Sequence, residues 1–236
     1  MNLPDIGPAG IERRGLREQV YDSVLRMLLD GRIAAGERLS IDTMARVLNV
    51  SPTPVREAFV MLERTGLVSR EALRGYRVAP PLDDEQLAEL FDARLLLEVE
   101  AARLAYAQRD ALIPMLRDLT AVHDERVARI AAHAQHEPVP FELTEAYFQS
   151  DADFHNAVFE VAGNRFLVGL YESLGALTHR MRQAVHRGPE DVLDASREHH
   201  RILEAFESAD ELAAAAAMRE HIENVRARSL ADSSSH

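Results

Sequence analysis

The chain of 236 residues is long enough for one or two folded domains, and its hydrophobic content of 47% is typical of a globular protein. It contains no cysteine, which excludes disulfides and thiolate metal sites, and nothing in its composition indicates export. No apolar run approaches membrane-span length and the N-terminus lacks a signal-peptide core, so we expect a soluble cytoplasmic protein.

The formal net charge of −12 is unevenly distributed along the chain. Residues 1–80 hold 12 Arg against 10 acidic residues, whereas residues 81–236 hold 15 Arg against 29 acidic residues. The N-terminal 80 residues (the head) are thus slightly basic, whereas the remainder of the chain (the body) is acidic. This distribution fits a protein in which only the head contacts phosphate groups.

The N-terminal region predicts a disordered segment and then two helices. Residues 1–10 are rich in Pro and Gly, and we expect them to be disordered. A helix is predicted over 12–30, ended by Gly31, because apolar residues recur on one face. That face consists of Leu16, Val20, Val24, Met27 and Leu28. A second helix is predicted near Ile41–Leu48, with Ser40 as its cap.

The third helix has two competing starts. Ser51 could cap it with Pro52 at the first helical position, or Thr53 could cap it with Pro54 first. The second start fits better, because a residue before proline avoids helical dihedral angles. The helix then runs to about Thr65 and buries Val55, Phe59, Leu62 and the following Leu67.

Residues 67–79 alternate weakly and predict a short hairpin with Gly75 in its turn, and Pro80–Pro81 mark a domain boundary. Residues 11–80 therefore predict a winged helix-turn-helix, a shape that fits the major groove of double-stranded DNA. Ser51, Thr53 and Arg56 at the start of the third helix would reach bases and phosphates, and the wing residues Arg74 and Gly75 would reach a minor groove or the backbone.

Residues 81–231 predict an all-α bundle of about six helices, followed by a disordered tail over 232–236. The first helix is capped by Asp84, and no strand pattern appears. The helices are expected at about 84–107, 110–134, 141–162, 165–187, 190–208 and 210–230. The fold class is therefore mainly α, with a winged head and a helical body.

Three helices of the body project imidazole or carboxylate groups toward a shared core. Asp151 and His155 share one helix face, and His199 and His221 each lie in an apolar stripe. These side chains suit Zn²⁺ or another divalent first-row metal, although a lone histidine on an apolar face is more often a hydrogen-bonded core residue. His200 could replace His199 if the register slips. The remaining histidines are interpreted as surface or core fillers: His123, His133, His136, His179 and His186.

Two further residues are candidates for an effector site. Arg94 lies on the apolar face of its helix with Glu98 four residues on, where an inward Arg would anchor an anionic effector; the alternative is a surface ion pair. Asn164 follows a Gly and opens a helix, which favours a capping role.

The head resembles the GntR family of bacterial transcription regulators. The matching stretches are LREQVYDSVL, DGRIAAGERLS, NVSPTPVREAFVMLERTGLV and RGYRV. The resemblance implies DNA contacts from Ser51, Thr53, Arg56 and Gly75. Family members often carry basic residues at the positions that Pro52 and Asp42 occupy here, which leaves this head with fewer basic contacts.

The body resembles the FCD effector domain of the FadR-like branch of that family. The matching stretches are RLLLEVEAARLA, DADFHNAVFEVAGN, EHHRILEAF and AMREHIENV. The resemblance implies a divalent metal, most simply Zn with Mn, Ni or Fe as alternatives, on Asp151, His155, His199 and His221. It also implies that the metal holds the carboxylate of a small organic acid, with Arg94 and Asn164 in the pocket.

These expectations describe a homodimeric regulator that is not an enzyme and that represses a pseudo-palindromic operator until an effector binds. Two rivals remain. A metal-dependent hydrolase could use the Asp and His cluster, but it lacks a clear general base and leaves the head unexplained. Alternatively, the metal ion itself could be the signal.

Overall fold

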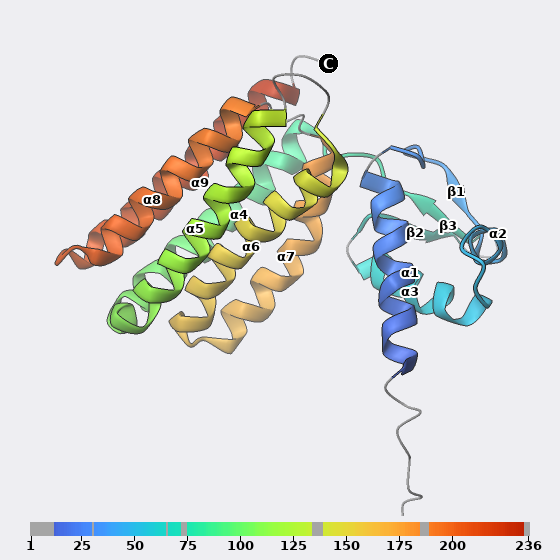
Figure 1. The fold of residues 1–236 in the computed structure, drawn as a ribbon, viewed down its shortest axis with the longest axis horizontal. Coiled ribbons are helices and arrows are strands. Elements are labelled where there is room, and N and C mark those ends of the chain that lie inside the picture. The colour runs from blue at the N-terminus through green and yellow to red at the C-terminus, as the bar shows by residue number, and fades with distance from the viewer. Residues whose placement is uncertain are drawn as a thin grey trace, which may run out of the picture. The chain divides into compact units, whose positions relative to one another are not determined.

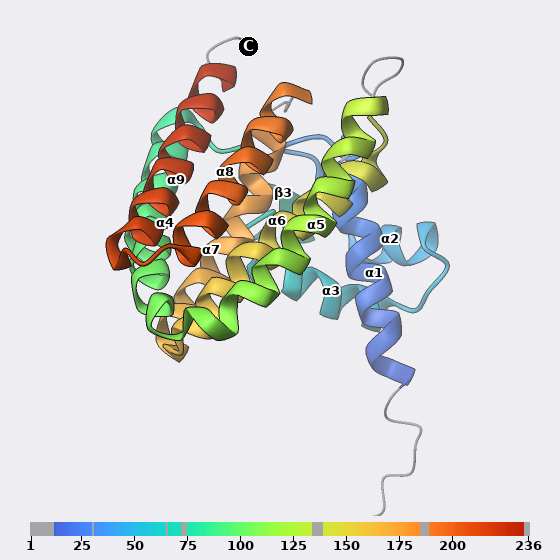
Figure 2. The same ribbon diagram turned by 60° about the vertical axis from the view of Figure 1, so that its left-hand side comes forward.

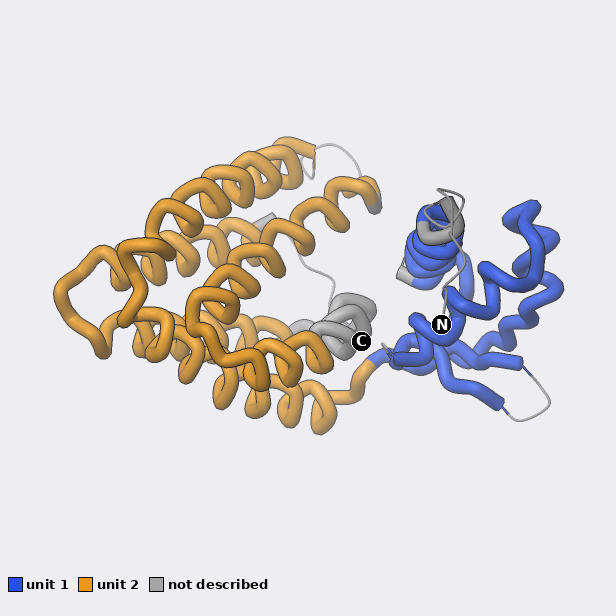
Figure 3. Tube along the Cα trace, turned by 90° about the horizontal axis from the view of Figure 1, so that it is seen from below, with its two compact units in different colours: residues 1–81, 175–183 blue, residues 82–174, 184–236 orange. Residues whose placement is uncertain are grey.

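The structure is a computed structural model that describes residues 12–29, 31–64, 66–71, 75–133, 139–184 and 189–233. The side chains of residues 12–14, 29, 141, 175–184, 189, 232 and 233 are not described. The chain divides into two compact units, the first of residues 1–81 and 175–183 and the second of residues 82–174 and 184–236 (Figure 3). The segment 1–10, expected to be disordered, and Arg74 of the wing lie outside the described residues.

Within residues 12–81, the described part of the first unit forms three helices and a three-stranded antiparallel sheet (Figure 1). Its helices α1 and α2 both pack against α3, and the strand order is β1-β3-β2. The predicted apolar faces form its core, since Val24, Val55 and Phe59 are fully buried, whereas Leu16 near the start of α1 is exposed. The elements are α1 (Glu12–Leu29), β1 (Arg38–Leu39), α2 (Ile41–Val47), α3 (Pro52–Arg64), β2 (Val68–Glu71) and β3 (Gly75–Val78).

Two helices begin at other residues than the sequence predicts. Helix α3 begins at Pro52 and not at Pro54. Both prolines fall in its first turn, where a missing N–H costs no helical hydrogen bond, so packing outweighs the local preference of Thr53. Helix α4 is capped by Asp83 and not by Asp84, because Asp83 and Gln86 form a reciprocal capping box.

The second unit is a helical bundle, and its described residues contain no strand. Helix α4 packs against α6 and α9, α5 packs against α6 and α8, and α8 packs against α9 (Figure 2). The elements are α4 (Asp84–Ala105), the 3-10 turn η2 (Tyr106–Gln108), α5 (Arg109–His133), α6 (Phe141–Ala162), α7 (Arg165–Ala184), α8 (Pro189–Glu207) and α9 (Glu211–Ser233). Helix α9 thus extends two residues into the tail expected to be disordered. None of the described helices has the length and apolarity that a membrane span requires.

Candidate metal centre and DNA-contacting residues

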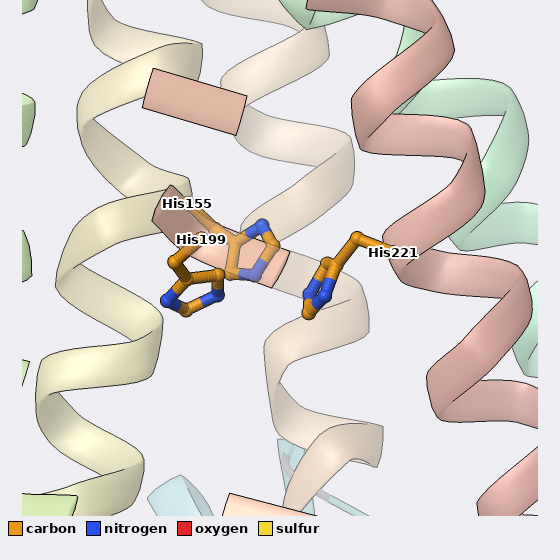
Figure 4. A group of neighbouring side chains, drawn as sticks. All are labelled: His155, His199 and His221. Atoms are coloured by element: carbon orange, nitrogen blue, oxygen red, sulfur yellow. The ribbon is translucent and has the colours of Figure 1, made fainter. Parts of the chain in front are cut away.

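Four helices of the bundle bury imidazoles beside one carboxylate. His123 comes from α5, His155 from α6, His199 from α8 and His221 from α9, and each is at most 1% exposed. The Asp151 side chain, one turn before His155, is 22% exposed. Figure 4 shows the rings of His155, His199 and His221 converging from their three helices.

The donor atoms form two groups that share His199. The first group is His155, His199 and His221, and the second is His123, Asp151 and His199; within each, the donor atoms lie within 4.8 Å of one another. His199 Nε2 lies 3.6 Å from Asp151 Oδ1. The structure therefore places three of the predicted ligands together and links Asp151 to them through His199. His123, which the sequence predicted to be a surface or core filler, also lies in the second group.

The spacing of apolar residues along α5 indicates that His123 is buried. The buried positions of α5 are Leu112, Leu116, Thr120, His123, Val127 and Ile130, spaced three or four residues apart. This spacing places His123 on the inward face of α5. The period alone cannot distinguish a ligand from a hydrogen-bonded core histidine.

Partners on neighbouring helices orient two of the rings. His221 Nδ1 lies 2.8 Å from Glu198 Oε2, and Glu198 accepts hydrogen bonds from Asn224 and from both Nη groups of Arg228. His155 Nδ1 lies 2.6 Å from Glu98 Oε2, a close approach without hydrogen-bond alignment. Because an ionised carboxylate only accepts hydrogen bonds, His221 Nδ1 carries the hydrogen and the neutral His221 ring keeps its lone pair on Nε2.

Several imidazole nitrogens are buried without a hydrogen-bond partner. Both nitrogens of His155 and both of His199 are in this state among the described residues. Phe154 stacks on the His199 ring at 4.2 Å and 4°, which fixes that ring without satisfying its nitrogens. An unsatisfied buried polar atom costs about 1–3 kcal/mol. A divalent cation would satisfy the nitrogen of each ring that has the lone pair, so the residues present fit a metal ion.

The electrostatics favour the ligand forms of these groups. Burial holds the pKa of His199 well below its usual value, and burial lowers the pKa of His221 although Glu198 opposes the shift. These rings are therefore neutral near pH 7. Burial would raise the pKa of Asp151, but the surrounding histidines outweigh it and lower that pKa, so the carboxylate is ionised.

Asp151 differs from the other carboxylates that contact the cluster. Glu98 accepts a hydrogen bond from Arg94 Nε at 2.6 Å, and Glu198 is paired with Arg228. The described ion pairs give Asp151 only His199 as a partner. A divalent ion on Asp151 and neutral imidazoles would therefore keep one net positive charge.

The two predicted effector residues have defined positions. Arg94 is 5% exposed, and its Nε donates a hydrogen bond to Glu98. Its side chain therefore lies inward beside the cluster. Asn164 is exposed, and its Oδ1 accepts from the backbone N–H groups of Phe166 and Leu167 at 3.1 and 3.3 Å. Asn164 is thus the cap of α7, and an effector contact would depend on its remaining Nδ2 group.

In the first unit, Ser51, Thr53 and Arg56 are exposed at the beginning of α3. Gly75 begins β3, opposite Glu71 of β2. Arg46, which the sequence analysis did not single out, is exposed in α2 and lines a surface depression with Asp42, Ser51 and Pro52. It places a basic side chain one helical turn after Asp42.

A winged helix-turn-helix joined to a helical bundle is the architecture of a class of DNA-binding transcriptional regulators. Two family models match the chain. Bacterial regulatory proteins of the gntR family match residues 16–78, and the FCD domain matches residues 89–224. The chain belongs to the GntR family of transcriptional regulators and carries a C-terminal FCD domain, which confirms the predicted family and fold class.

Named relatives cover nearly the whole chain. The uncharacterized HTH-type transcriptional regulator BphR of Paraburkholderia xenovorans is 30% identical, covering 94% of this chain and 89% of its own. The Glc operon transcriptional activator of Escherichia coli is 28% identical, with 91% and 89% covered. The transcriptional repressor RspR of Escherichia coli is 26% identical, with 89% and 87% covered.

Solved structures share the fold at low identity. The McbR/YncC protein of E. coli has a TM-score of 0.68 at 22% identity, covering 90% of this chain and 95% of its own. The metal-free FCD domain of TM0439 has a TM-score of 0.51 at 20% identity, covering 66% of this chain and 99% of its own.

Proposed function

We propose that this protein is a DNA-binding repressor whose operator affinity is controlled by a small organic acid held at a divalent metal in the FCD domain. The observation that carries the proposal is a set of buried imidazole nitrogens that lack a hydrogen-bond partner among the described residues, beside Asp151, whose described ion pair is with His199 and not with an Arg. A protein that only needed a packed core would not bury these groups unpaired.

The metal ligands in this proposal are Asp151, His155, His199 and His221, and the ion is Zn²⁺, with Mn, Ni or Fe as alternatives. Bound there, the ion acts as a Lewis acid that holds a carboxylate oxygen. The net positive charge that Asp151 leaves uncompensated favours an anionic effector. Arg94, whose charge is balanced by Glu98, offers a second anchor, and we assign its Nη groups to the effector carboxylate because its Nε is used by Glu98.

The first unit supplies the DNA contacts. Exposed Ser51, Thr53 and Arg56 at the beginning of α3 would enter the major groove, and Arg74 and Gly75 of the wing would follow the backbone. Residues 1–80 carry a net charge of only +2, since they hold 12 Arg and 10 acidic residues. One head therefore binds weakly, and we propose a homodimer on a pseudo-palindromic operator.

Native mass spectrometry of the protein purified from its own host tests the assembly. We expect a dimer with one metal ion per chain and a small carboxylic acid retained on part of the sample. Metal-free chains isolated without chelators and with intact histidines would contradict the metal proposal. A monomer at operator-binding concentrations would contradict the proposed dimer.

Operator titration tests whether an organic acid controls DNA binding. A DNA fragment selected from genomic fragments is titrated with metal-loaded protein, with and without a panel of carboxylic acids. We expect one acid class to weaken binding, and an acid that tightens binding would contradict repression that the effector relieves.

Two further measurements distinguish the alternative functions, a sensor of the metal ion and a metal-dependent hydrolase. If metal alone, without an acid, switches operator binding, the ion is the signal. If metal-loaded protein hydrolyses a model ester or phosphate and His155→Ala abolishes that activity, the cluster belongs to a hydrolase.

A further inference from the structure

His123 is a buried histidine that the four-ligand set does not use. It lies in α5, is 0% exposed, and its ring centroid lies 4.8 Å from that of His199 and 5.0 Å from that of Tyr147. A histidine in this position either completes a hydrogen-bond network or binds a cation.

The hydrogen bonds of Ser150 determine which nitrogen of His123 carries the proton. Ser150 Oγ donates to the carbonyl oxygen of Tyr147 at 2.7 Å, which uses its only hydrogen. His123 Nδ1 lies 2.9 Å from the same Oγ. Since Ser150 can only accept there, Nδ1 donates, and His123 Nε2 keeps its lone pair.

That lone pair lies among other electron donors. His123 Nε2 is buried without a hydrogen-bond partner among the described residues. The donor atoms of His123, Asp151 and His199 lie within 4.8 Å of one another. A lone pair and an ionised carboxylate repel each other across a dry interior unless a positive charge lies between them.

We propose that His123 Nε2 is a fifth protein ligand of the metal ion, joining Asp151 and His199 from the α5 side. This inference rests on the proposed metal centre. A single ion is favoured over two, because Asp151 is the one carboxylate of the cluster without an Arg partner in the described ion pairs, and two divalent ions would bring four positive charges to it.

The fifth ligand changes how an effector binds. With four protein ligands, a six-coordinate ion keeps two positions, which suits a chelating acid. With His123 added, such an ion would keep one position, and the effector carboxylate would bind through one oxygen. Arg94 is then the residue that orients the rest of the carboxylate.

Metal titration of three forms of the full-length protein tests the inference. Metal-free wild type, His123→Phe and His200→Phe are titrated with Co²⁺ in competition with a chelator, and the visible absorption of bound Co²⁺ is recorded. His200 is the matched control, because it is half-exposed and bonds Asp124 outside the cluster.

We expect one Co²⁺ per chain in the wild type and in His200→Phe. His123→Phe should bind Co²⁺ about tenfold or more weakly, since loss of an outer-shell partner alone costs 10- to 100-fold, and its absorption band should change. Wild-type affinity and spectrum in His123→Phe would overturn the fifth ligand and leave the metal centre standing. Absence of metal uptake by the wild type would overturn both.

A measurement on the unaltered ring covers the case in which His123→Phe misfolds. In histidine-labelled wild type, Zn²⁺ should shift the ¹⁵N resonance of His123 Nε2 together with those of the other ligands, with assignment from His123→Gln. An unshifted His123 Nε2 beside shifted resonances of His155 and His199 would overturn the inference.

Discussion

At the scale of single residues, the candidate metal centre depends on side chains that do not touch the ion. Glu198 receives hydrogen bonds from Arg228, Asn224 and His221, and Glu98 links Arg94 to His155. The contact with Glu198 selects the tautomer of His221 and so decides where the lone pair of that ring lies. Helical spacing indicated the candidate ligands but not these partners, because the Glu98–His155 and Glu198–Arg228 contacts join different helices and form only in the folded bundle.

The role of Glu198 leads to the first prediction. Glu198→Gln keeps the size of the side chain but removes the charge that favours the Nδ1–H tautomer of His221. We expect metal affinity to fall about 10- to 100-fold, measured by chelator competition. Glu220→Gln, which alters an exposed pair with Arg201, is the control and should bind like the wild type. Equal affinity in both variants would show that His221 needs no carboxylate partner.

The second prediction concerns Arg56 in the first unit. Its side chain is exposed at the beginning of α3, so Arg56→Ala should remove a DNA contact without disturbing the core. We expect operator binding to weaken by about 1–3 kcal/mol in a gel-shift titration. Arg64→Ala, at the other end of the same helix, should have a smaller effect. If both variants bind like the wild type, Arg56 makes no productive contact.

At the scale of elements, strand β1 constrains the wing. Only two residues long, it pairs Arg38 with Arg77 and Leu39 with Tyr76 of β3. Its backbone passes so close to Gly75 that a Cβ there would lie 2.7 Å from the Leu39 carbonyl oxygen, and Gly75 has φ +89°. The glycine is therefore required by the packing of β1 as well as by its own dihedral angle.

This packing gives the third prediction. Gly75→Ala should destabilise the sheet by about 1–3 kcal/mol from backbone strain, and more if β1 must move. Faster hydrogen exchange of the Tyr76 and Val78 amides would report it. Gly15→Ala is the control, because a Cβ in that helical position of α1 meets nothing within 4 Å and alanine should stabilise the helix. Equal exchange rates in Gly75→Ala and wild type would show that β1 can move away from residue 75 without destabilising the sheet.

The elements also show where sequence patterns succeed and fail. Helix α6 occupies Phe141–Ala162 as predicted, because its apolar period is long and Gly163 ends it in a left-handed conformation. Strand β1 was not predicted, since two residues are too few to alternate. The α3 start was wrong because the dihedral preference of one residue is small beside the packing of Val55 and Phe59. His123 was missed because its partners Ser150 and His199 come from other helices.

At the scale of the whole molecule, the proposed function requires that a ligand in the second unit controls DNA binding by the first. The four imidazoles come from α5, α6, α8 and α9, so an ion at their centre ties together the helices that form the bundle. Metal binding is then also a contribution to folding, because the unfolded chain holds no preformed site.

The fourth prediction follows from that linkage. A metal-loaded sample should unfold at a higher temperature than a chelator-treated one, and added Zn²⁺ should restore the difference. Free ion at about 1,000 times its Kd contributes roughly 4 kcal/mol. The double variant His155→Ala, His199→Ala should show no metal-dependent shift. A shift that persists in this variant would place the stabilising ion elsewhere.

The fifth prediction concerns the coupling between effector and operator. If an acid lowers operator affinity by a given factor, operator DNA must lower the affinity for that acid by the same factor, because both values describe one free-energy difference. Typical couplings of 1–3 kcal/mol correspond to about 5- to 150-fold. Calorimetry of acid binding with and without operator DNA measures one factor, and operator titration with and without acid measures the other.

A variant of the metal centre tests the same coupling. His199→Ala should reduce both factors to one while leaving acid-free operator affinity intact, because His199 lies in the bundle and Arg56 in the head. If His199→Ala instead weakens operator binding without any acid present, the metal centre supports the DNA-binding state directly, and the acid cannot be the sole signal.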